Sequence, residues 1–311
     1  MDRSSGRSLP DSPDGYSYRC LERDLLRLRQ RYPRLEQGSL GRSVLGRPLH
    51  YLRLGNGPHE FFYNAAHHAN EWITSPVLMR FAADLAAAYS AGEMIGGYPA
   101  AALWERSSIY LLPMVNPDGV ELVLGNENPE CYEIPARVIR ELAGTGTPLA
   151  RVWKANIRGV DLNLNYPAGW EEAKRIEWEQ GITGPAAHDY GGPAPLSEPE
   201  TGAVAAFTCQ HDFRLVLAFH TQGRVIYWRY LDEYPPGAWE IAQVLAAVSG
   251  YGLEANPPDA SYAGYKDWFI HDFDRPGFTV EVGKGVNPLP ASDLEEIYRE
   301  NLPLMVRAAL V

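Results

Sequence analysis

Two side chains able to bind a divalent metal stand three residues apart in segment 64–72. They are His68 and Glu71, which follow a predicted strand and open a predicted helix. If the first helical turn includes both, they lie on one face, and an imidazole and a carboxylate are standard zinc ligands. The alternative is that the pair only caps a helix. The spacing therefore predicts part of a metal site that needs a third ligand from elsewhere.

His220 is the candidate third ligand. It closes the apolar run 215–219, so we expect it at a strand end of a buried sheet, where α/β enzymes collect their active sites. Three protein ligands would leave zinc one position open for water, which is typical of a catalytic site. His220 could instead be a core histidine with satisfied hydrogen bonds. The pattern predicts one Zn²⁺ ion held by His68, Glu71 and His220.

Glu281 is a carboxylate inside the apolar, strand-like run 277–283. Burying its charge would cost several kcal/mol unless the charge is used or paired. A carboxylate beside a zinc-bound water can accept its proton, so Glu281 is the candidate general base. The competing interpretation is a strand-edge glutamate that faces solvent.

Polar and apolar residues alternate in segment 156–165. An arginine near zinc, such as Arg158, could stabilise the oxyanion that forms when water attacks a carbonyl. An aspartate such as Asp161 could orient a ligating histidine through its second ring nitrogen. Taken alone, the segment could also be an ordinary polar loop.

Alternating strands and helices must position these residues. Apolar periodicity predicts strands over 49–54, 60–66, 108–115, 214–219, 225–228 and 277–282. It predicts helices over 18–31, 73–89, 198–210, 236–249, 266–273 and 292–309. This α/β order implies a mixed or parallel sheet covered on both faces. The long Gly-, Pro- and polar-rich stretches 125–134, 143–149 and 181–196 are predicted to be functional loops.

Composition limits the class of partner. The 311 residues include 45% hydrophobic and 22% charged residues, which predicts one globular domain over 1–311. The net charge of −11 argues against nucleic acid and anionic membranes as partners, because both need clustered Lys and Arg. The three cysteines form no CxxC pair and predict neither disulfides nor a thiolate zinc site.

The polar N-terminal segment 1–17 is expected to be loosely ordered. It has no apolar stretch able to act as a signal-peptide core, and no later stretch reaches the length of a membrane span. We therefore expect a cytoplasmic protein. The sequence does not predict an oligomeric state.

Six ordered motifs, from about residue 45 to the C-terminus, resemble the carboxypeptidase A-like zinc peptidases. They are His68-x-x-Glu71, Asn116-Pro-Asp-Gly119, Gly159-Val-Asp-Leu-Asn163, Ser197-Glu-x-Glu200, His220 and Glu281. The resemblance implies a single-domain, three-layer α/β/α fold with a twisted, mostly eight-stranded mixed sheet.

The resemblance also implies roles for single residues. Zinc would be held by the three ligands proposed above, Glu281 would transfer the proton, Asp161 would support His68, and Asn163 would contact substrate. Arg158 is the oxyanion candidate, with Lys154 or Arg151 as alternatives, because the family's arginine often lies further upstream.

Two departures from the digestive carboxypeptidases bear on substrate. Leu164 and Asn70 stand where those enzymes have arginines, and one of those arginines grips the substrate's C-terminal carboxylate. Losing these guanidinium groups removes a bidentate grip on a carboxylate. Ordinary trimming of protein C-termini is therefore not expected.

The departures resemble a bacterial subgroup, the γ-D-glutamyl-(L)-meso-diaminopimelate peptidases, which cut peptidoglycan stem peptides. The echoes are in segments 68–72, 155–163, 264–269 and 276–285. The resemblance places Lys266 in the pocket for the residue after the scissile bond, where it could meet a carboxylate of diaminopimelate or be an ordinary solvated lysine. Tyr262 could correspond to a tyrosine on a mobile loop that closes over substrate, although an ungapped alignment puts Asp259 there.

The leading hypothesis is thus a zinc metallopeptidase that cuts the γ-D-Glu to diaminopimelate bond in a muropeptide or free stem peptide. A metallocarboxypeptidase or deacylase acting on another small peptide or acyl-amino acid is the alternative. A non-catalytic binding protein with this fold is a third.

Overall fold

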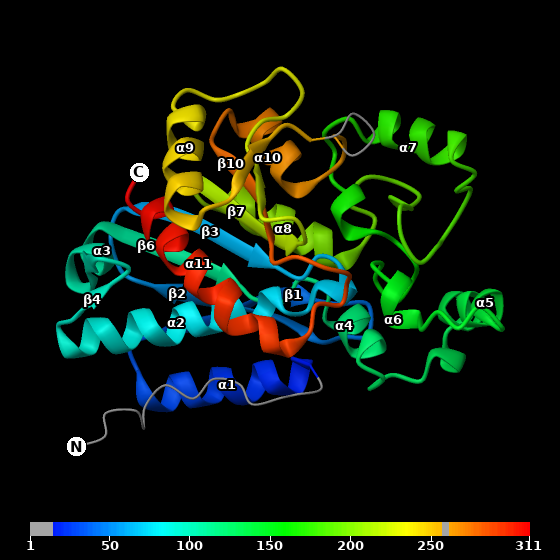
Figure 1. The fold of residues 1–311 in the computed structure, drawn as a ribbon, viewed down its shortest axis with the longest axis horizontal. Helices are drawn as coiled ribbons and strands as arrows, with labels where there is room; N and C mark the ends of the chain where they lie inside the picture. The colour runs from blue at the N-terminus through cyan, green and yellow to red at the C-terminus, as the bar shows by residue number, and fades with distance from the viewer. Residues whose placement is uncertain (1–14, 257–260) are drawn as a thin grey trace.

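A mixed eight-stranded sheet forms the centre of the computed structural model, which describes residues 15–256 and 261–311 (Figure 1). In sheet order the strands are β1 (Glu36–Arg42), β2 (Pro48–Leu54), β6 (Ser107–Leu112), β3 (His59–Ala65), β7 (Phe213–Thr221), β10 (Gly277–Val282), β8 (Val225–Tyr227) and β9 (Gly252–Glu254). A separate hairpin pairs β4 (Met94–Ile95) with β5 (Tyr98–Pro99).

The four central strands β6, β3, β7 and β10 run parallel. Their carboxyl ends therefore meet at one edge of the sheet, which is where α/β proteins bind ligands. His68 follows β3, His220 lies near the end of β7, and Glu281 lies near the end of β10. Residues far apart in the sequence are thus brought to one place by the strand order.

Helices cover both faces of the sheet and complete the three-layer fold. They are α1 (Tyr18–Arg31), α2 (Thr74–Ala91), α3 (Ala100–Arg106), α4 (Pro117–Val123), α5 (Glu133–Leu142), α6 (Leu149–Val152), α7 (Trp170–Glu179), α8 (Pro199–Gln210), α9 (Ala238–Ser249), α10 (Tyr265–Phe273) and α11 (Leu294–Ala308). Helices α1, α2, α9 and α11 share one apolar core with the sheet, whereas α8 and α10 pack in the core on the other face. The predicted fold class is confirmed.

Each predicted strand and helix has a counterpart, and the helix over 18–31 has the predicted bounds. The missed elements had weak signals. Strand β1 carries two glycines and no apolar alternation, because it is a partly exposed edge strand. Helix α7 begins within a polar stretch, and α5 begins inside the predicted loop 125–134.

The N-terminal prediction is wrong for residues 15–17, and residues 1–14 lie outside the described part of the chain. Tyr16 is buried and its hydroxyl donates to Asp24 Oδ2 at 3.1 Å. Ser17 caps α1 by accepting from Cys20 N at 3.2 Å. An apolar ring and a helix cap thus hold these residues in place. Within residues 15–256 and 261–311, no helix has the length and apolarity needed to cross a membrane.

Candidate metal centre and its cleft

Three candidate metal ligands converge at the sheet edge. His220 Nδ1 lies 3.0 Å from Glu71 Oε2 and 3.3 Å from His68 Nδ1, and His68 Nδ1 lies 2.9 Å from Glu71 Oε1. One ligand atom from each residue lies within 4.8 Å of the others. Contrary to the expected α-helical turn, His68 and Glu71 are joined by the 3-10 turn Ala69–Glu71, and α2 begins only at Thr74.

The donor set fits a zinc ion. Two imidazole nitrogens and a carboxylate surround one point, with Glu71 and His220 buried and His68 partly exposed, and this combination with one remaining open position is characteristic of catalytic zinc. Thr221 N also donates to Glu71 Oε2, at 3.2 Å, and fixes the direction of that carboxylate. A divalent cation at this point would satisfy all three groups together, which a single proton cannot do.

Asp161 contacts His68, the residue with which the resemblance pairs it. Its Oδ1 lies 3.0 Å from His68 Nε2, so the other ring nitrogen, Nδ1, faces the metal position. Burial raises the pKa of Asp161, but the charge of His68 and its hydrogen bond outweigh burial and hold that pKa below its usual range. Asp189 N, in the predicted functional loop 181–196, donates to Asp161 Oδ2 at 3.3 Å.

His67 is a neighbour of the centre that sequence reasoning missed. It is fully buried, its ring stacks 5.7 Å from that of His220, and its Nε2 lies 3.0 Å from the Tyr166 hydroxyl. Burial holds its pKa well below the usual value, so His67 stays neutral. The two adjacent histidines, His67 and His68, were visible in the sequence, but only the structure shows that His68 faces the metal position and His67 packs behind it.

Glu281 stands beside the candidate ligands. It pairs in register with His220 across the parallel strands β10 and β7. Burial and then the Glu71 carboxylate raise its pKa, while His68 and Lys154 lower it. A carboxyl group with a raised proton affinity next to the metal position is suited to accept a proton and return it.

The structure does not bring Arg158 to the centre. Its side chain is 56% exposed and lies 3.6 Å from Glu198. The reason is a turn: Asn156 Oδ1 accepts from the backbone nitrogens of Arg158 and Val160, and Gly159 adopts a positive φ of 77°. Arg158 therefore projects outward from the turn.

Lys154 lines the cleft instead. Its ammonium has no hydrogen-bond or ion-pair partner among the described residues, and the carboxylates of Glu71, Asp161, Asp189 and Glu281 together raise its pKa against the effect of burial. Its backbone is fixed, since its carbonyl accepts from Ala69 N at 2.9 Å. The other alternative, Arg151, does not line the cleft. Lys154 thus becomes the candidate for the oxyanion.

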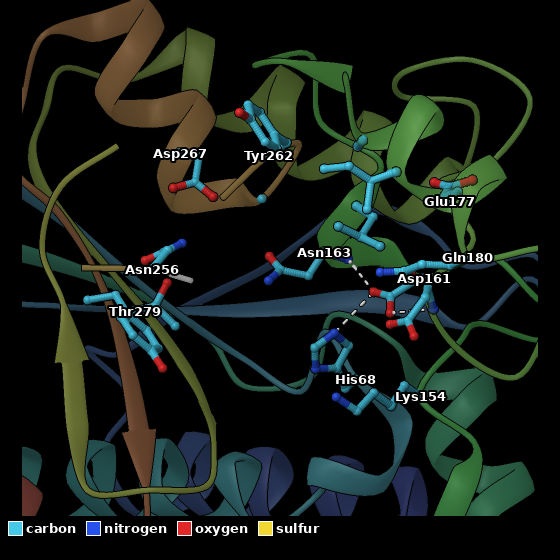
Figure 2. Close-up of a pocket in the computed structure, with 16 residues that line it drawn as sticks. His68, Lys154, Asp161, Asn163, Glu177, Gln180, Asn256, Tyr262, Asp267 and Thr279 are labelled. Atoms are coloured by element: carbon cyan, nitrogen blue, oxygen red, sulfur yellow. Dashed lines mark hydrogen bonds and ion pairs between the residues drawn. The ribbon is translucent and has the colours of Figure 1, made fainter. Parts of the chain in front are cut away.

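A cavity of about 260 Å³ opens over the centre and has two walls (Figure 2). Figure 2 shows Asn256, Tyr262, Asp267 and Thr279 on one side, Glu177 and Gln180 on the other, and His68 with Lys154 between them. Helix α7 also adds Ala173 and Ile176 to its wall, and Asn163 and Leu164 line the cavity as well. Asp189, from loop 181–196, lines it too, but no residue of loops 125–134 and 143–149 does. The sequence did not predict α7, so it could not predict that this helix lines the cavity.

Lys266 does not face substrate, contrary to the sequence-based expectation. Only 1% of its side chain is exposed. Its ammonium donates to the Arg229 carbonyl at 2.6 Å, to Asn256 Oδ1 at 3.3 Å and to Asp267 Oδ1. A lysine has three N–H donors, so none is left for a substrate carboxylate.

Buried polar contacts hold the turn that carries Asp161. Asn156 Nδ2 donates to Glu198 Oε2 at 2.8 Å and to Glu200 Oε2 at 3.5 Å, and Glu200 Oε1 accepts from Val44 N at 2.9 Å. Both glutamates come from the motif at the start of α8. Burial, reinforced by the nearby Asp118 and Glu198 carboxylates, raises the pKa of Glu200 to about 7.

This raised pKa predicts a pH-dependent stability. Because the folded pKa of Glu200 exceeds its unfolded value, its contribution is fully present below about pH 4.5 and is lost as the pH rises through about 7. Relative to Glu200→Gln, the wild-type unfolding free energy should fall by on the order of 3 kcal/mol over this range. Urea unfolding of zinc-loaded protein at pH 5 and pH 8 measures it, with exposed Glu130→Gln as control. A pH-independent difference would contradict the expectation.

Comparison with known proteins decides the family. The sequence profile of the zinc carboxypeptidase family matches residues 21–304. The chain belongs to this family. Zinc carboxypeptidases are hydrolases that use a zinc ion, so the predicted zinc metallopeptidase and its Zn²⁺ cofactor are confirmed.

Similar proteins include a bacterial endopeptidase and a human carboxypeptidase. A γ-D-glutamyl-L-diamino acid endopeptidase 1 from Lysinibacillus sphaericus is 41% identical over 304 residues, covering 96% of this chain and 73% of that protein. Human mast cell carboxypeptidase A is 24% identical over 234 residues, covering 70% of this chain and 48% of that protein.

Solved structures share the fold at low identity. Thrombin-activatable fibrinolysis inhibitor matches with a TM-score of 0.71 and 18% identity, covering 94% of this chain and 73% of that one. Murein-tripeptide amidase MpaA from Escherichia coli O157 matches with a TM-score of 0.53 and 20% identity, covering 87% and 91%. These matches support the carboxypeptidase-like fold alone.

Proposed function

We propose that this metallopeptidase hydrolyses the amide between γ-D-glutamate and the L-centre of a diamino acid, with meso-diaminopimelate as the physiological case, in peptidoglycan stem peptides. The observation that carries the hydrolytic part is the cluster of His68, Glu71 and His220 beside Glu281 under an open cavity. The bond is supported by the similarity to the endopeptidase, which extends over nearly the whole chain.

The residues divide the chemistry between them. When bound, zinc supplies a Lewis acid that polarises the carbonyl and acidifies water. Glu281 accepts the proton of the attacking water and returns it to the leaving amine. Lys154, whose ammonium has no partner among the described residues, lines the cavity and would stabilise the negative charge that develops on the carbonyl oxygen. Asp161 holds His68 in the tautomer that binds metal.

The cavity disfavours the carboxypeptidase alternative. Leu164 lines it where the digestive enzymes have an arginine, and Asn70 is buried, with its amide donating to the Arg151 carbonyl at 3.4 Å. Among the described residues that line the cavity, Lys154 is the one lysine and there is no arginine. A free C-terminal carboxylate would therefore find no guanidinium pair to hold it. Asn163 and Tyr262 remain in place to contact the peptide.

Two substrates separate the hypotheses. Incubation with L-Ala-γ-D-Glu-meso-diaminopimelate should release L-Ala-D-Glu and free diaminopimelate, which mass spectrometry identifies. A blocked dipeptide with a free C-terminal carboxylate should remain intact. Cleavage of the dipeptide alone would replace the proposal by a carboxypeptidase, and a zinc-loaded protein inactive on both would favour a binding protein.

Lys154 and Arg158 form a matched pair for testing oxyanion stabilisation. Replacing Lys154 by Met should lower kcat by about 100- to 1,000-fold, since removal of one oxyanion donor has effects of this size. Replacing Arg158 by Met should change kcat by less than about threefold, because its side chain faces solvent. Steady-state kinetics on the stem tripeptide measure both. A larger loss at Arg158 than at Lys154 would restore the arginine as the oxyanion group.

A further inference from the structure

Lys266 lies behind the wall formed by Asn256, Asp267 and Thr279 and forms a buried ion pair with Asp267. Lys266 on α10 spends its three donors on the Arg229 carbonyl, Asn256 Oδ1 and Asp267 Oδ1. The Lys266 ammonium thereby links the segment after β8, the loop after β9 and helix α10. Asn256 and Asp267 line the cavity, whereas Lys266 does not. These hydrogen bonds fix the positions of Asn256 and Asp267, while the Lys266 ammonium itself does not line the cavity.

Asp267 lines the cavity and has one carboxylate oxygen, Oδ2, that does not bond to Lys266. Its Oδ1 meets Lys266, and its side chain is only 4% exposed although it borders the cavity (Figure 2). Its Oδ2 lies against Gly264, where a Cβ would approach it to 2.6 Å. The absence of a side chain at Gly264 therefore leaves room for the carboxylate. An ionised carboxylate can accept about four hydrogen bonds, so one partner does not exhaust it.

This wall stands on the leaving-group side of the centre. Thr279 and Glu281 are two residues apart on β10, so their side chains share one face of the sheet. Because Glu281 returns the proton to the leaving amine, the part of the substrate released as an amine lies along this face. In the proposed reaction the wall of Asn256, Asp267 and Thr279 would therefore face that part, and α7 would face the acyl part.

We infer that Asp267 binds a side-chain ammonium of the leaving amino acid and that Lys266 is the positioning residue that holds Asp267. This inference rests on the proposed function and adds the group that selects the leaving residue.

Charge and burial favour the ammonium over a carboxylate as the group that contacts Asp267. A substrate carboxylate at this wall would meet Asp267 and find every Lys266 donor occupied. An ammonium would instead form a charge-assisted hydrogen bond to a carboxylate already held in place. An apolar side chain would leave Asp267 desolvated and without a second partner, which is costly. The wall thus favours a diamino acid over its monoamino analogue.

The test compares two substrates with the same carbon skeleton on the zinc-loaded, full-length enzyme. L-Ala-γ-D-Glu-L-lysine and L-Ala-γ-D-Glu-L-norleucine differ by one terminal amino group. We expect wild-type kcat/KM to favour lysine by roughly 10-fold or more, mostly through KM. Acetylating the lysine Nε should abolish the preference. Neither measurement needs a variant that folds.

Variants then assign the residues. Asp267→Asn should bring the lysine to norleucine ratio close to one, and Lys266→Met should lower it, with partial recovery in Lys266→Arg. Asp212→Asn is the matched control, because this exposed aspartate lies at the other end of β7 from His220. Zinc content and melting temperature accompany each variant.

The outcomes are distinct. Equal cleavage of lysine and norleucine peptides by the wild type would overturn the inference and leave the γ-D-glutamyl assignment standing. A wild-type preference that persists in folded Asp267→Asn would also overturn it. Failure to cleave these peptides and the diaminopimelate peptide would instead overturn the proposed function.

Discussion

Replacing Glu281 by Gln should lower kcat by about 1,000-fold, within the range that general acid-base catalysis contributes. The amide keeps the size and position of the side chain but can neither accept the proton of water nor return it to the leaving amine. Glu281 is not among the three converging ligands, so the variant should still bind one zinc ion. Single-turnover kinetics on the stem tripeptide and metal analysis by mass spectrometry measure the two effects.

Glu254→Gln is the control for this experiment. Glu254 lies on the edge strand β9 and is exposed. The substitution therefore removes one carboxylate from the same sheet without changing the metal centre. Its kcat should stay within about threefold of wild type, as is usual for surface substitutions. A zinc-loaded Glu281→Gln enzyme with more than a tenth of wild-type activity would remove Glu281 from the role of base.

The fold was predictable where burial leaves a periodic pattern. The run 215–219 is apolar because β7 is central and covered on both faces, and 18–31 repeats its apolar residues because α1 packs one side on the core. Strand β1 lacked such a pattern because it is an edge strand with two glycines. Apolar periodicity reflects burial, so it does not predict elements that are partly exposed.

The convergence of the three candidate ligands was predictable from the sequence, but the directions of the nearby cationic side chains were not. His68, Glu71 and His220 stand at strand ends, and the parallel order of β3 and β7 makes those ends meet. Arg158 and Lys154 lie four residues apart in one loop, and only the turn at Gly159 decides which faces the metal. Lys266 was assigned wrongly because the sequence shows its charge but not the three acceptors that its ammonium bonds to.

Glu71→Gln should abolish zinc binding at micromolar metal and lower activity by more than about 1,000-fold. Glu71 is the one anionic ligand of the three and lies within 3.0 Å of both histidine Nδ1 atoms, so its charge offsets that of the ion while an amide cannot. The expected loss combines failure to hold the metal with loss of the chemistry that the metal supplies.

Thermal unfolding separates metal loss from misfolding in this variant. Zinc at 100 times its Kd should stabilise the metal-stripped wild type by about 2.7 kcal/mol, because only the folded state presents the three ligands together. Added zinc should leave the melting temperature of Glu71→Gln unchanged. Glu172→Gln is the control, since Glu172 is a surface residue of α7 paired with Arg175, and it should respond as wild type does. A zinc-dependent rise in Glu71→Gln equal to that of the wild type would show that the ion is held without this carboxylate, and the ligand set would have to be reassigned among the neighbours of His68 and His220.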